Sequence, residues 1–277
     1  MNEVLAAGQL RKMHTSLQAP VDYQLPLGDT LVPMNSLIGE SLALDFLGLI
    51  NCIHCGRKTK KSFNQGYCYP CFSRLAQCDS CIVSPEKCHY HEGTCREPEW
   101  GDEHCMIDHI VYLANSSGVK VGITRGSQVP TRWMDQGAIQ ALPVFRVSTR
   151  RLSGLVEVAY KQHIADKTNW RAMLKGQVDP LDLAAERDRL FELCANEIAA
   201  LQGEHGLQAI QLIESGEAVE ISYPVEEYPV KIVSFNLDKQ ALVQGRLMGI
   251  KGQYLIFDAG VINMRKYGGY HLQLSRN

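Results

Sequence analysis

The sequence lacks several features that would assign it to a broad class at once. No apolar run approaches the roughly 20 residues that a membrane-spanning helix needs. The N-terminal segment MNEVLAAGQLRKMHTS has no apolar core followed by a small-residue cleavage site. Internal repeats, low-complexity segments and a phosphate-binding loop of the GxxxxGK(S/T) type are also missing. We therefore expect a soluble, cytoplasmic protein without a membrane partner.

Excess charge of either sign is also missing. The 277 residues carry a formal net charge of -2, which excludes a globally basic nucleic-acid binder but leaves room for local basic patches. Hydrophobic residues make up 45% of the chain, enough for a folded protein of roughly two domains. Composition therefore leaves both the partner and the oligomeric state open.

Cysteine, by contrast, is plentiful and unevenly distributed. Nine of the ten cysteines lie between Cys52 and Cys105, and only Cys194 falls outside this stretch. In a chain without a secretory signal, such a cluster is more typical of metal binding than of disulfides. Cys194 follows the apolar pattern of a helix, so we expect it to be a packing residue.

Two closely spaced cysteine pairs form the first candidate metal site. Two residues separate Cys52 from Cys55 and Cys68 from Cys71, and twelve residues separate the pairs. Two such pairs can complete the closed tetrahedron of a structural zinc, which leaves no open position for catalysis. The spacing predicts a zinc-ribbon-like module with these four ligands.

A third pair, Cys78 and Cys81, begins a second candidate site. Cys88 and Cys95 complete a set of four thiolates. Three competing ligands lie nearby: His89, His91 and Cys105. A second zinc is the first choice, and an iron–sulfur cluster is the alternative, because it also uses four thiolates and its spacings vary. Ordinary buried cysteines would explain some of these residues equally simply.

A basic and aromatic stretch separates the first two cysteine pairs. Its members are Arg57, Lys58, Lys60, Lys61, Phe63 and Tyr67, followed by Tyr69 and Phe72. Such residues suit phosphate contacts and base stacking, which favours DNA or RNA as the partner. A solvated loop beside the aromatic core of a small module is an equally good interpretation.

The segment 107–175 has an ordered pattern of predicted elements. HIVYLA and VKVGIT are expected to be two strands joined by the turn Asn115–Gly118. A short helix in SQVPTRWMDQGA follows, with Ser127 or Thr131 as its cap. A strand in ALPVFRVS and an amphipathic helix over TRRLSGLVEVAYKQHIADKTNW complete the segment.

The second of these strands has two different faces. Val119, Val121 and Ile123 share an apolar face, whereas Lys120 and Gly122 lie on the other. A glycine within a strand lets another group approach the backbone closely. That group can be a ligand or only a neighbouring side chain.

This order and several of its residues resemble the GIY-YIG nuclease domain over roughly residues 107–175. Tyr112, in VYL, occupies the tyrosine position of the first motif, and Lys120 with Gly122, in KVG, aligns with the second. Arg132 matches the arginine at the start of the first helix. Glu157 matches the metal-binding glutamate of the later helix.

The chain departs from the GIY-YIG pattern at two positions. Lys120 stands where the second motif has a tyrosine, and Val111 stands where glycine is usual. Asn169 lies where the family often places a further polar residue. Lysine is normally protonated at pH 7, so Lys120 would need a lowered pKa to act as a base. It would otherwise hold the phosphate as a charge.

The resemblance implies a phosphodiesterase that uses Mg²⁺ or Mn²⁺. Glu157 would hold the ion, Arg132 would stabilise charge on the phosphate, and Tyr112 would orient or activate the attacking water. One carboxylate suits Mg²⁺, which keeps several waters and accepts phosphate oxygens. The guanidinium of arginine matches the geometry of a phosphodiester.

Both ends of the chain are expected to be β-structure. Residues 1–50 and residues 215–277 contain short alternating segments with glycine and proline. Neither end is long enough to bury a core alone, so we expect one small barrel or sandwich built from both. The cysteine module (51–106), the GIY-YIG-like domain (107–175) and one connecting helix (180–203) would be inserted between them. The predicted fold class is α+β.

Over nearly its full length the chain also resembles a prokaryotic family of uncharacterised proteins, known as a domain of unknown function. That resemblance implies no activity, so three functions stay open. The first is a metal-dependent endonuclease acting on DNA or RNA. The second is a non-catalytic nucleic-acid binder on a degenerate nuclease scaffold, which Lys120 favours. The third is a zinc-containing interaction protein, which the net charge of -2 favours.

Overall fold

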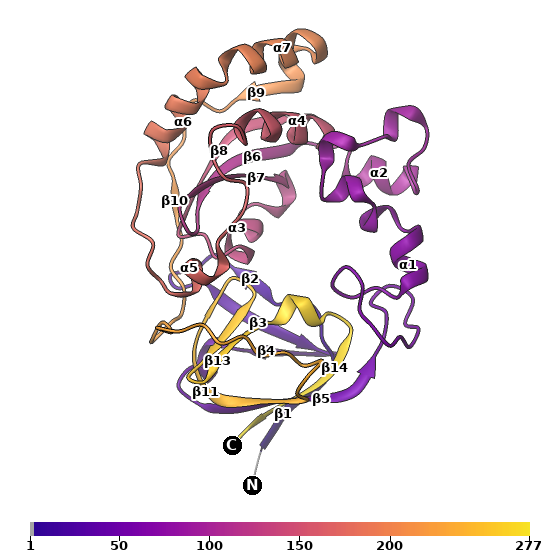
Figure 1. Cartoon of the computed structure of the whole chain (residues 1–277), viewed down its shortest axis with the longest axis vertical. Coiled ribbons are helices and arrows are strands. Elements are labelled where there is room, and N and C mark those ends of the chain that lie inside the picture. Colours follow the sequence, from indigo (N-terminus) through magenta and orange to yellow (C-terminus); the bar gives the residue numbers. More distant parts are fainter. Residues whose placement is uncertain (1–2) are drawn as a thin grey trace. The chain divides into compact units, whose positions relative to one another are not determined.

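The computed structural model describes residues 3–277, which divide into two compact units (Figure 1). The first unit contains the chain up to Ser73 together with residues 174–176 and 221–277. The second contains residues 74–173 and 177–220. Residues 51–106, expected to form one cysteine-rich module, are therefore divided between the units at Arg74. No helix over residues 3–277 has the length and apolar character needed to cross a membrane.

The first unit is mostly β-structure. Its elements are β1 (Glu3–Gln9), β2 (His14–Ser16), β3 (Asp22–Leu27), β4 (Thr30–Pro33), β5 (Ser41–Ile50), α1 (Tyr69–Arg74), β11 (Leu242–Lys251), β12 (Tyr254–Phe257), β13 (Gly260–Asn263) and β14 (Tyr270–Arg276). Over the described residues, β1, β14, β5, β11, β12 and β13 form a six-stranded sheet in that order, and β2, β3 and β4 form a second sheet.

The six-stranded sheet joins the two ends of the chain. β14 pairs antiparallel with both β1 and β5, and Leu274 of β14 lies opposite Leu44 of β5. Both leucine side chains are fully buried. The N- and C-terminal segments thus share one core, because each alone has too few strands to bury its apolar face. Of the expected barrel or sandwich, a closed barrel is not found over residues 3–277, since β1 and β13 remain at opposite ends of the sheet.

The second unit contains several helices and a smaller sheet. Its elements are α2 (Pro98–His104), β6 (His109–Asn115), β7 (Val119–Arg125), α3 (Thr131–Asp135), β8 (Gln140–Val147), α4 (Arg150–Tyr160), α5 (Trp170–Leu174, except its last residue), α6 (Leu183–Leu193), α7 (Ala195–His205), β9 (Ile210–Leu212) and β10 (Val219–Glu220). The strand order is β10-β8-β6-β7, with β9 paired to β8. β6, β7, α3, β8 and α4 follow one another as strand, strand, helix, strand and helix.

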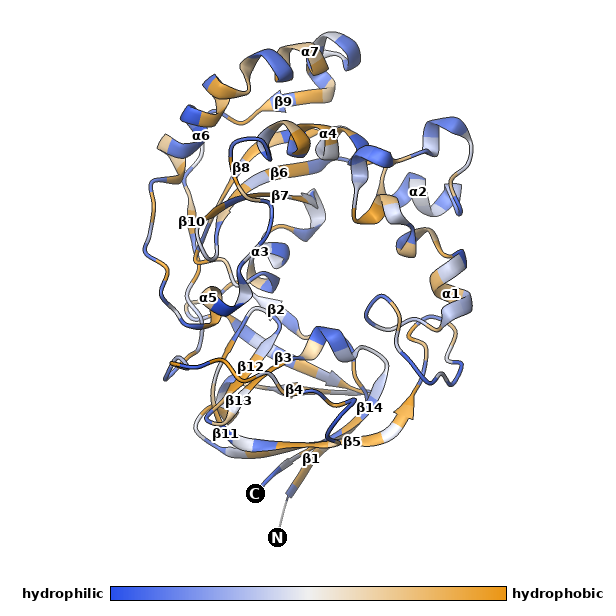
Figure 2. Cartoon of the chain, in the orientation of Figure 1, coloured by the Kyte–Doolittle hydropathy of each residue, from blue (hydrophilic) through white to orange (hydrophobic). Residues whose placement is uncertain are grey.

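The core of this unit lies between the sheet and three helices. Val111 and Val121 of the strands, Val156 of α4 and Cys194 beside α6 belong to one cluster of buried side chains. Cys194 is fully buried, which confirms its expected packing role. Figure 1 shows α6 and α7 on the opposite side of β6 and β8 from α3. In Figure 2, β6 and β8 are mainly hydrophobic, whereas α6 and α7 alternate between hydrophobic and hydrophilic residues.

Two predicted helices have different lengths from those expected. The helix predicted to reach "DKTNW" ends at Tyr160, because the following segment turns back along β7, where the Val121 amide donates to the Ala165 carbonyl oxygen at 2.9 Å. The single helix predicted over 180–203 is two helices, α6 and α7, which meet at Cys194. The Cys194 thiol lies 3.9 Å from the carbonyl oxygen of Ala159 and anchors this junction to α4.

The short helix α3 begins without the expected side-chain cap. Its N-cap residue is Pro130, and neither Ser127 nor Thr131 occupies that position. The helix ends before Gly137, whose φ of 68° is left-handed, as its place after the helix predicts.

Candidate functional site

The two faces of the β6–β7 hairpin meet different surroundings. Val121 is fully buried in the apolar cluster, and Val119 and Ile123 pack against it, as the alternating pattern predicts. On the opposite face the Tyr112 ring packs edge-on against Trp133 of α3, with ring centroids 5.9 Å apart. The candidate site residues Tyr112 and Lys120 therefore share the face that lies toward α3.

Tyr112 is held by its neighbours on every side. Its side chain is fully buried, and its hydroxyl donates to Gln136 Oε1 at 3.0 Å. Tyr112 lies opposite Gly122 in the strand register, and a Cβ on Gly122 would be 2.7 Å from the Tyr112 hydroxyl oxygen. The bare backbone of Gly122 therefore admits a neighbouring side chain, which is one of the two alternatives left open by the sequence.

The hydroxyl of Tyr112 stays protonated at neutral pH. Burial raises the pKa of Tyr112 to about 12, against the opposing charge and hydrogen bonding of Arg132. The negative charge of Glu157 adds to the increase in the Tyr112 pKa. In this state Tyr112 is suited to donate a hydrogen bond and to position Arg132, rather than to accept a proton.

Lys120 has an unusual environment for a lysine. Only 4% of the residue is exposed, and burial together with the charge of Arg132 lowers the pKa of its ammonium group to about 8. The carboxylates of Glu157 and Asp166 oppose this decrease in the Lys120 pKa. Lys120 thus loses its proton near pH 8 and can then act as a base. A lowered pKa is what the resemblance to the GIY-YIG motif requires if Lys120 is to have that role.

Glu157 lies in a second charged group at the end of α4. Its residue exposure is 9%, and burial raises the pKa of its carboxyl group, against the attraction of Lys161. The Lys161 Nζ lies 3.4 Å from Glu157 Oε2 and 3.2 Å from Asp166 Oδ2. One ammonium group therefore bridges two carboxylates. Oxygen donors of this kind suit Mg²⁺ or Mn²⁺ in place of the ammonium group.

The four predicted site residues come from four elements and influence one another. Arg132 of α3 and Glu157 of α4 both affect the pKa values of Tyr112 and Lys120. Such mutual effects require the groups to lie close together in a poorly solvated region. The fold therefore brings this set together across 46 residues of chain.

Three neighbours of this group were missed from the sequence. Gln136 follows α3 by one residue, and Asp166 is in the segment that turns back along β7; no local pattern marks either of them. Lys161 was visible as the residue four positions after Glu157 on the helix. Asn169, by contrast, is exposed and caps α5, accepting from the Ala172 amide at 3.2 Å.

The first cysteine site is fully formed within the first unit. The sulfur atoms of Cys52, Cys55, Cys68 and Cys71 all lie within 4.8 Å of one another. Cys55 Sγ and Cys68 Sγ are 3.7 Å apart, close to the roughly 3.8 Å edge of a tetrahedron with zinc–sulfur bonds of about 2.3 Å. Gly56 closes the first turn with a φ of 71°, and its amide donates to the Cys52 carbonyl oxygen. This group can hold a metal ion such as zinc.

The basic stretch beside this site lines an open cavity in the first unit. Lys60, Lys61, Lys266 and Tyr270 border a space of about 530 Å³. The aromatic residues pack partly on one another, since the Phe63 ring centroid lies 5.5 Å from that of Tyr69 and 5.7 Å from that of Phe72. The stretch thus supplies both a basic surface and the packing of a small module.

The second cysteine group is arranged differently from the predicted set. Cys81, Cys88, Cys95 and Cys105 line one small, apolar cavity in the second unit, and Cys78 is not among the lining residues. The thiolates of Cys88, Cys95 and Cys105 all raise the pKa of Cys81, after burial and the charge of Asp79. None of the ten cysteines, all within the described chain, forms a disulfide.

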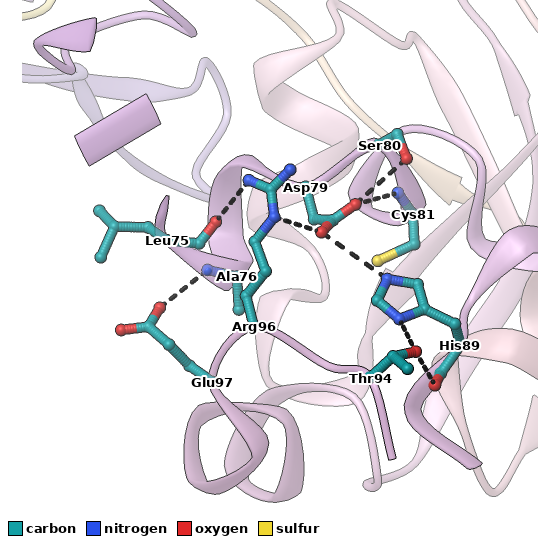
Figure 3. Close-up of polar contacts among 9 residues, drawn as sticks. All are labelled: Leu75, Ala76, Asp79, Ser80, Cys81, His89, Thr94, Arg96 and Glu97. Carbon is teal, nitrogen blue, oxygen red and sulfur yellow. Dashed lines mark hydrogen bonds and ion pairs between the residues drawn. The ribbon is translucent and has the colours of Figure 1, made fainter. Parts of the chain in front are cut away.

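A polar cluster of Asp79, Cys81 and His89 borders the same cavity (Figure 3). One ligand atom from each lies within 4.8 Å of the others. Asp79 Oδ2 is already paired with the Arg96 Nε at 2.6 Å, and Asp79 Oδ1 caps the Cys81 amide. The His89 Nδ1 is hydrogen-bonded to the Thr94 hydroxyl at 2.7 Å. The Arg96 guanidinium therefore shares the Asp79 carboxylate with this group.

Comparison with known proteins places the chain in a family. A family model described as a protein of unknown function (DUF2797) matches residues 39–272, most of the chain. The chain belongs to this family. The DUF2797 region contains all ten cysteines and all four residues of the Tyr112–Glu157 group, and its description names neither a nuclease nor a zinc ribbon. No curated protein and no solved structure matches the chain.

Proposed function

We propose that this protein is a divalent-metal-dependent phosphodiesterase of the GIY-YIG type that acts on DNA or RNA. The observation that carries the proposal is the group of Tyr112, Lys120, Arg132 and Glu157. These residues follow the family order in the sequence, and their charges act on one another in the folded chain. A buried lysine whose pKa is lowered by burial and by a neighbouring arginine is more frequent at functional sites than elsewhere.

Each residue has a defined part in this proposal. Arg132 binds the scissile phosphate, because its guanidinium matches phosphate geometry and keeps its charge. Tyr112 positions Arg132 through its hydroxyl. Lys120, neutral above about pH 8, accepts the proton of the attacking water at Nζ.

Glu157 and Asp166 are the residues that fit a divalent ion. Their oxygens already share one cation, the Lys161 ammonium group. When bound, Mg²⁺ or Mn²⁺ would neutralise charge on the phosphate and orient its ligands. Lys161 would then swing into solvent, since its side chain is 32% exposed.

A second candidate function is nucleic-acid binding without cleavage. The cavity lined by Lys60, Lys61 and Lys266, with Asp238 beside Lys266, supports it, because clustered lysines beside aromatic rings suit single-stranded nucleic acid. Such binding would weaken steeply with salt as phosphate counterions are released.

The experiment is a cleavage and binding panel. Labelled single-stranded, duplex and branched DNA and structured RNA are incubated with Mg²⁺ or Mn²⁺ and wild-type protein, Glu157→Gln or the exposed control Glu192→Gln. Wild type and Glu192→Gln should cleave at least one substrate, and Glu157→Gln should be slower by about 100-fold or more, a typical loss for a catalytic group.

The alternative outcomes separate the candidates. Full activity in Glu157→Gln would rule out the proposed site. Salt-sensitive binding without cleavage would favour the second candidate. Absence of both binding and cleavage would favour the zinc-containing interaction protein.

A further inference from the structure

The cavity lined by Cys81, Cys88, Cys95 and Cys105 has the features of a metal-cluster site that the proposed function does not use. Its other lining residues include Ile82, Trp100 and Gly101, so four thiols face one apolar space. Cys88 and Cys105 are buried to 8% and 7% exposure. Four converging thiols in an apolar setting are unusual as simple core packing, because they come from separate turns of a segment with little regular structure.

The spacing of the four sulfur atoms does not suit a single zinc ion. A zinc tetrahedron needs sulfurs roughly 3.8 Å apart, from bonds of about 2.3 Å. No three of these four sulfurs, all in the described chain, lie within 4.8 Å of one another, whereas the first cysteine group meets that limit with all four. A cubane iron–sulfur cluster binds each thiolate to a different iron, so it needs sulfurs that surround a space without touching.

The charge around the cavity fits an anionic group. Four thiolates on a [4Fe–4S]²⁺ core give a net charge of about -2. Arg150 lies beside the cavity, since its amide donates to the Cys105 carbonyl oxygen and its Nη2 donates to the Ile82 carbonyl oxygen. The Nε of Arg150 is buried without a hydrogen-bond acceptor in the described chain. A cluster sulfur or a ligating thiolate is an acceptor of the kind that this N–H lacks.

We propose that Cys81, Cys88, Cys95 and Cys105 hold a [4Fe–4S] cluster. The ligand spacing is then Cys-x6-Cys-x6-Cys-x9-Cys. Cys105 takes the place that the sequence assigned to Cys78. Asp79 and His89 stay outside the ligand set, because Asp79 is paired with Arg96 and the His89 Nδ1 is hydrogen-bonded to Thr94.

The cluster braces the helix that carries Glu157. The carbonyl oxygen of Cys105 accepts from the Arg150 amide at 2.8 Å, at the start of α4. The Arg150 Nη2 donates to the carbonyl oxygen of Ile82, next to Cys81. The backbone of the ligand Cys105 and that of Ile82, the neighbour of the ligand Cys81, therefore both bind Arg150 at the start of α4.

The test is metal analysis of the full chain, purified without oxygen. Iron, acid-labile sulfide and zinc are measured, with Mössbauer and visible absorption spectra of the protein as isolated and after reconstitution with iron and sulfide. We expect about four irons and four sulfides per chain, together with zinc at the first cysteine group. Zinc at both sites, with no iron or sulfide bound even after reconstitution, would overturn the proposal.

Matched variants identify the ligands. Cys105→Ser should lose at least three quarters of the iron and sulfide and keep the zinc, whereas Cys78→Ser and Asp79→Asn should keep both metals. Retention of the cluster in Cys105→Ser with its loss in Cys78→Ser would overturn this ligand set. The retained zinc and the far-ultraviolet circular dichroism spectrum report whether each variant is folded.

A measurement on the wild-type protein does not depend on whether the variants fold. Native protein is alkylated with iodoacetamide before and after the cluster is removed by oxidation, and the labelled cysteines are located by mass spectrometry. Cys81, Cys88, Cys95 and Cys105 should gain label together when iron is lost. Labelling that does not change with iron content would contradict the assignment. These readouts are independent of nuclease activity, so the two proposals can fail separately.

Discussion

At the scale of single residues, two buried lysines show how surroundings decide chemistry. Lys120 and Lys251 are both almost fully buried, and burial lowers the pKa of each ammonium group to about 8. Lys251 lies 5.4 and 5.3 Å from the ring centroids of Tyr223 and Tyr228, a setting of cation–π contacts. Lys120 instead has the charged groups of Arg132, Glu157 and Asp166 close enough to affect its pKa, as its proposed role in proton transfer requires.

The pKa of Lys120 predicts a pH-dependent effect on stability. Because the folded-state pKa of about 8 lies below the ordinary 10.5, the protonated form is disfavoured in the folded chain. This penalty is fully present below pH 8 and disappears as the pH rises toward 10.5. Lys120→Met should therefore raise the free energy of unfolding at pH 7 by up to about 3 kcal/mol.

Urea denaturation at pH 7 and pH 10 measures this difference. The gain from Lys120→Met should shrink at the higher pH, and the exposed control Lys167→Met should change little at either pH. A Lys120→Met protein that is no more stable than wild type at pH 7 would show that the lysine is well solvated or well paired.

At the scale of elements, α4 connects the cysteine-rich turns to the proposed catalytic group. Gly154 lets the short turn Pro85–Lys87 lie directly on this helix, since a Cβ at Gly154 would be 2.5 Å from the Glu86 amide nitrogen. The Glu86 backbone cannot move aside to make room for a Cβ, as the end of a flexible side chain could. The glycine is thus a packing requirement, although glycine disfavours a helix interior.

Substitution of Gly154 tests this packing. Gly154→Ala should lower the free energy of unfolding by about 1–3 kcal/mol, as expected for overpacking. Gly203→Ala in α7 is the matched control, because no atom lies within 4 Å of its added Cβ. It should raise stability by about 0.5–1 kcal/mol, since alanine favours a helix. Equal effects of the two substitutions in chemical denaturation would contradict the close contact on α4.

At the scale of the whole molecule, two units with separate cores predict two responses to metal loss. The Cys52–Cys71 group belongs to the first unit, whereas the second cysteine group belongs to the other. The four thiolates connect the end of β5 to the start of α1, a segment with little regular structure of its own. A metal ion bound there would contribute directly to the stability of that segment.

Cys71→Ser should therefore remove zinc and lower the thermal midpoint of one transition by about 5 °C or more, the shift expected for a loss of about 2 kcal/mol. Calorimetry and zinc analysis measure the two effects. Cys194→Ser, in the other unit, should keep its zinc. Zinc bound as tightly in Cys71→Ser as in wild type would show that the four cysteines are not the ligands.

Local features of the fold could be predicted from the sequence alone. Period-two alternation identified β6 and β7 and the buried face of Val119, Val121 and Ile123, because a strand turns successive side chains to opposite faces. The two Cys-x2-Cys pairs identified the first cysteine group, which can hold a metal ion, since two residues are the span of a single turn. The family of unknown function was also identified from the sequence.

Contacts between residues far apart in the sequence depend on how the elements pack in three dimensions. Cys105, and not Cys78, lines the second cavity. Its carbonyl oxygen accepts from the Arg150 amide at the start of α4, 45 residues further along the chain. The spacing of the cysteines does not reveal this contact. Asp166 reaches Lys161 and Lys120 only because the chain turns back after Tyr160. The Lys120 pKa likewise depends on burial and on charges from separate elements. No local pattern encodes these contacts, because each depends on how complete elements pack.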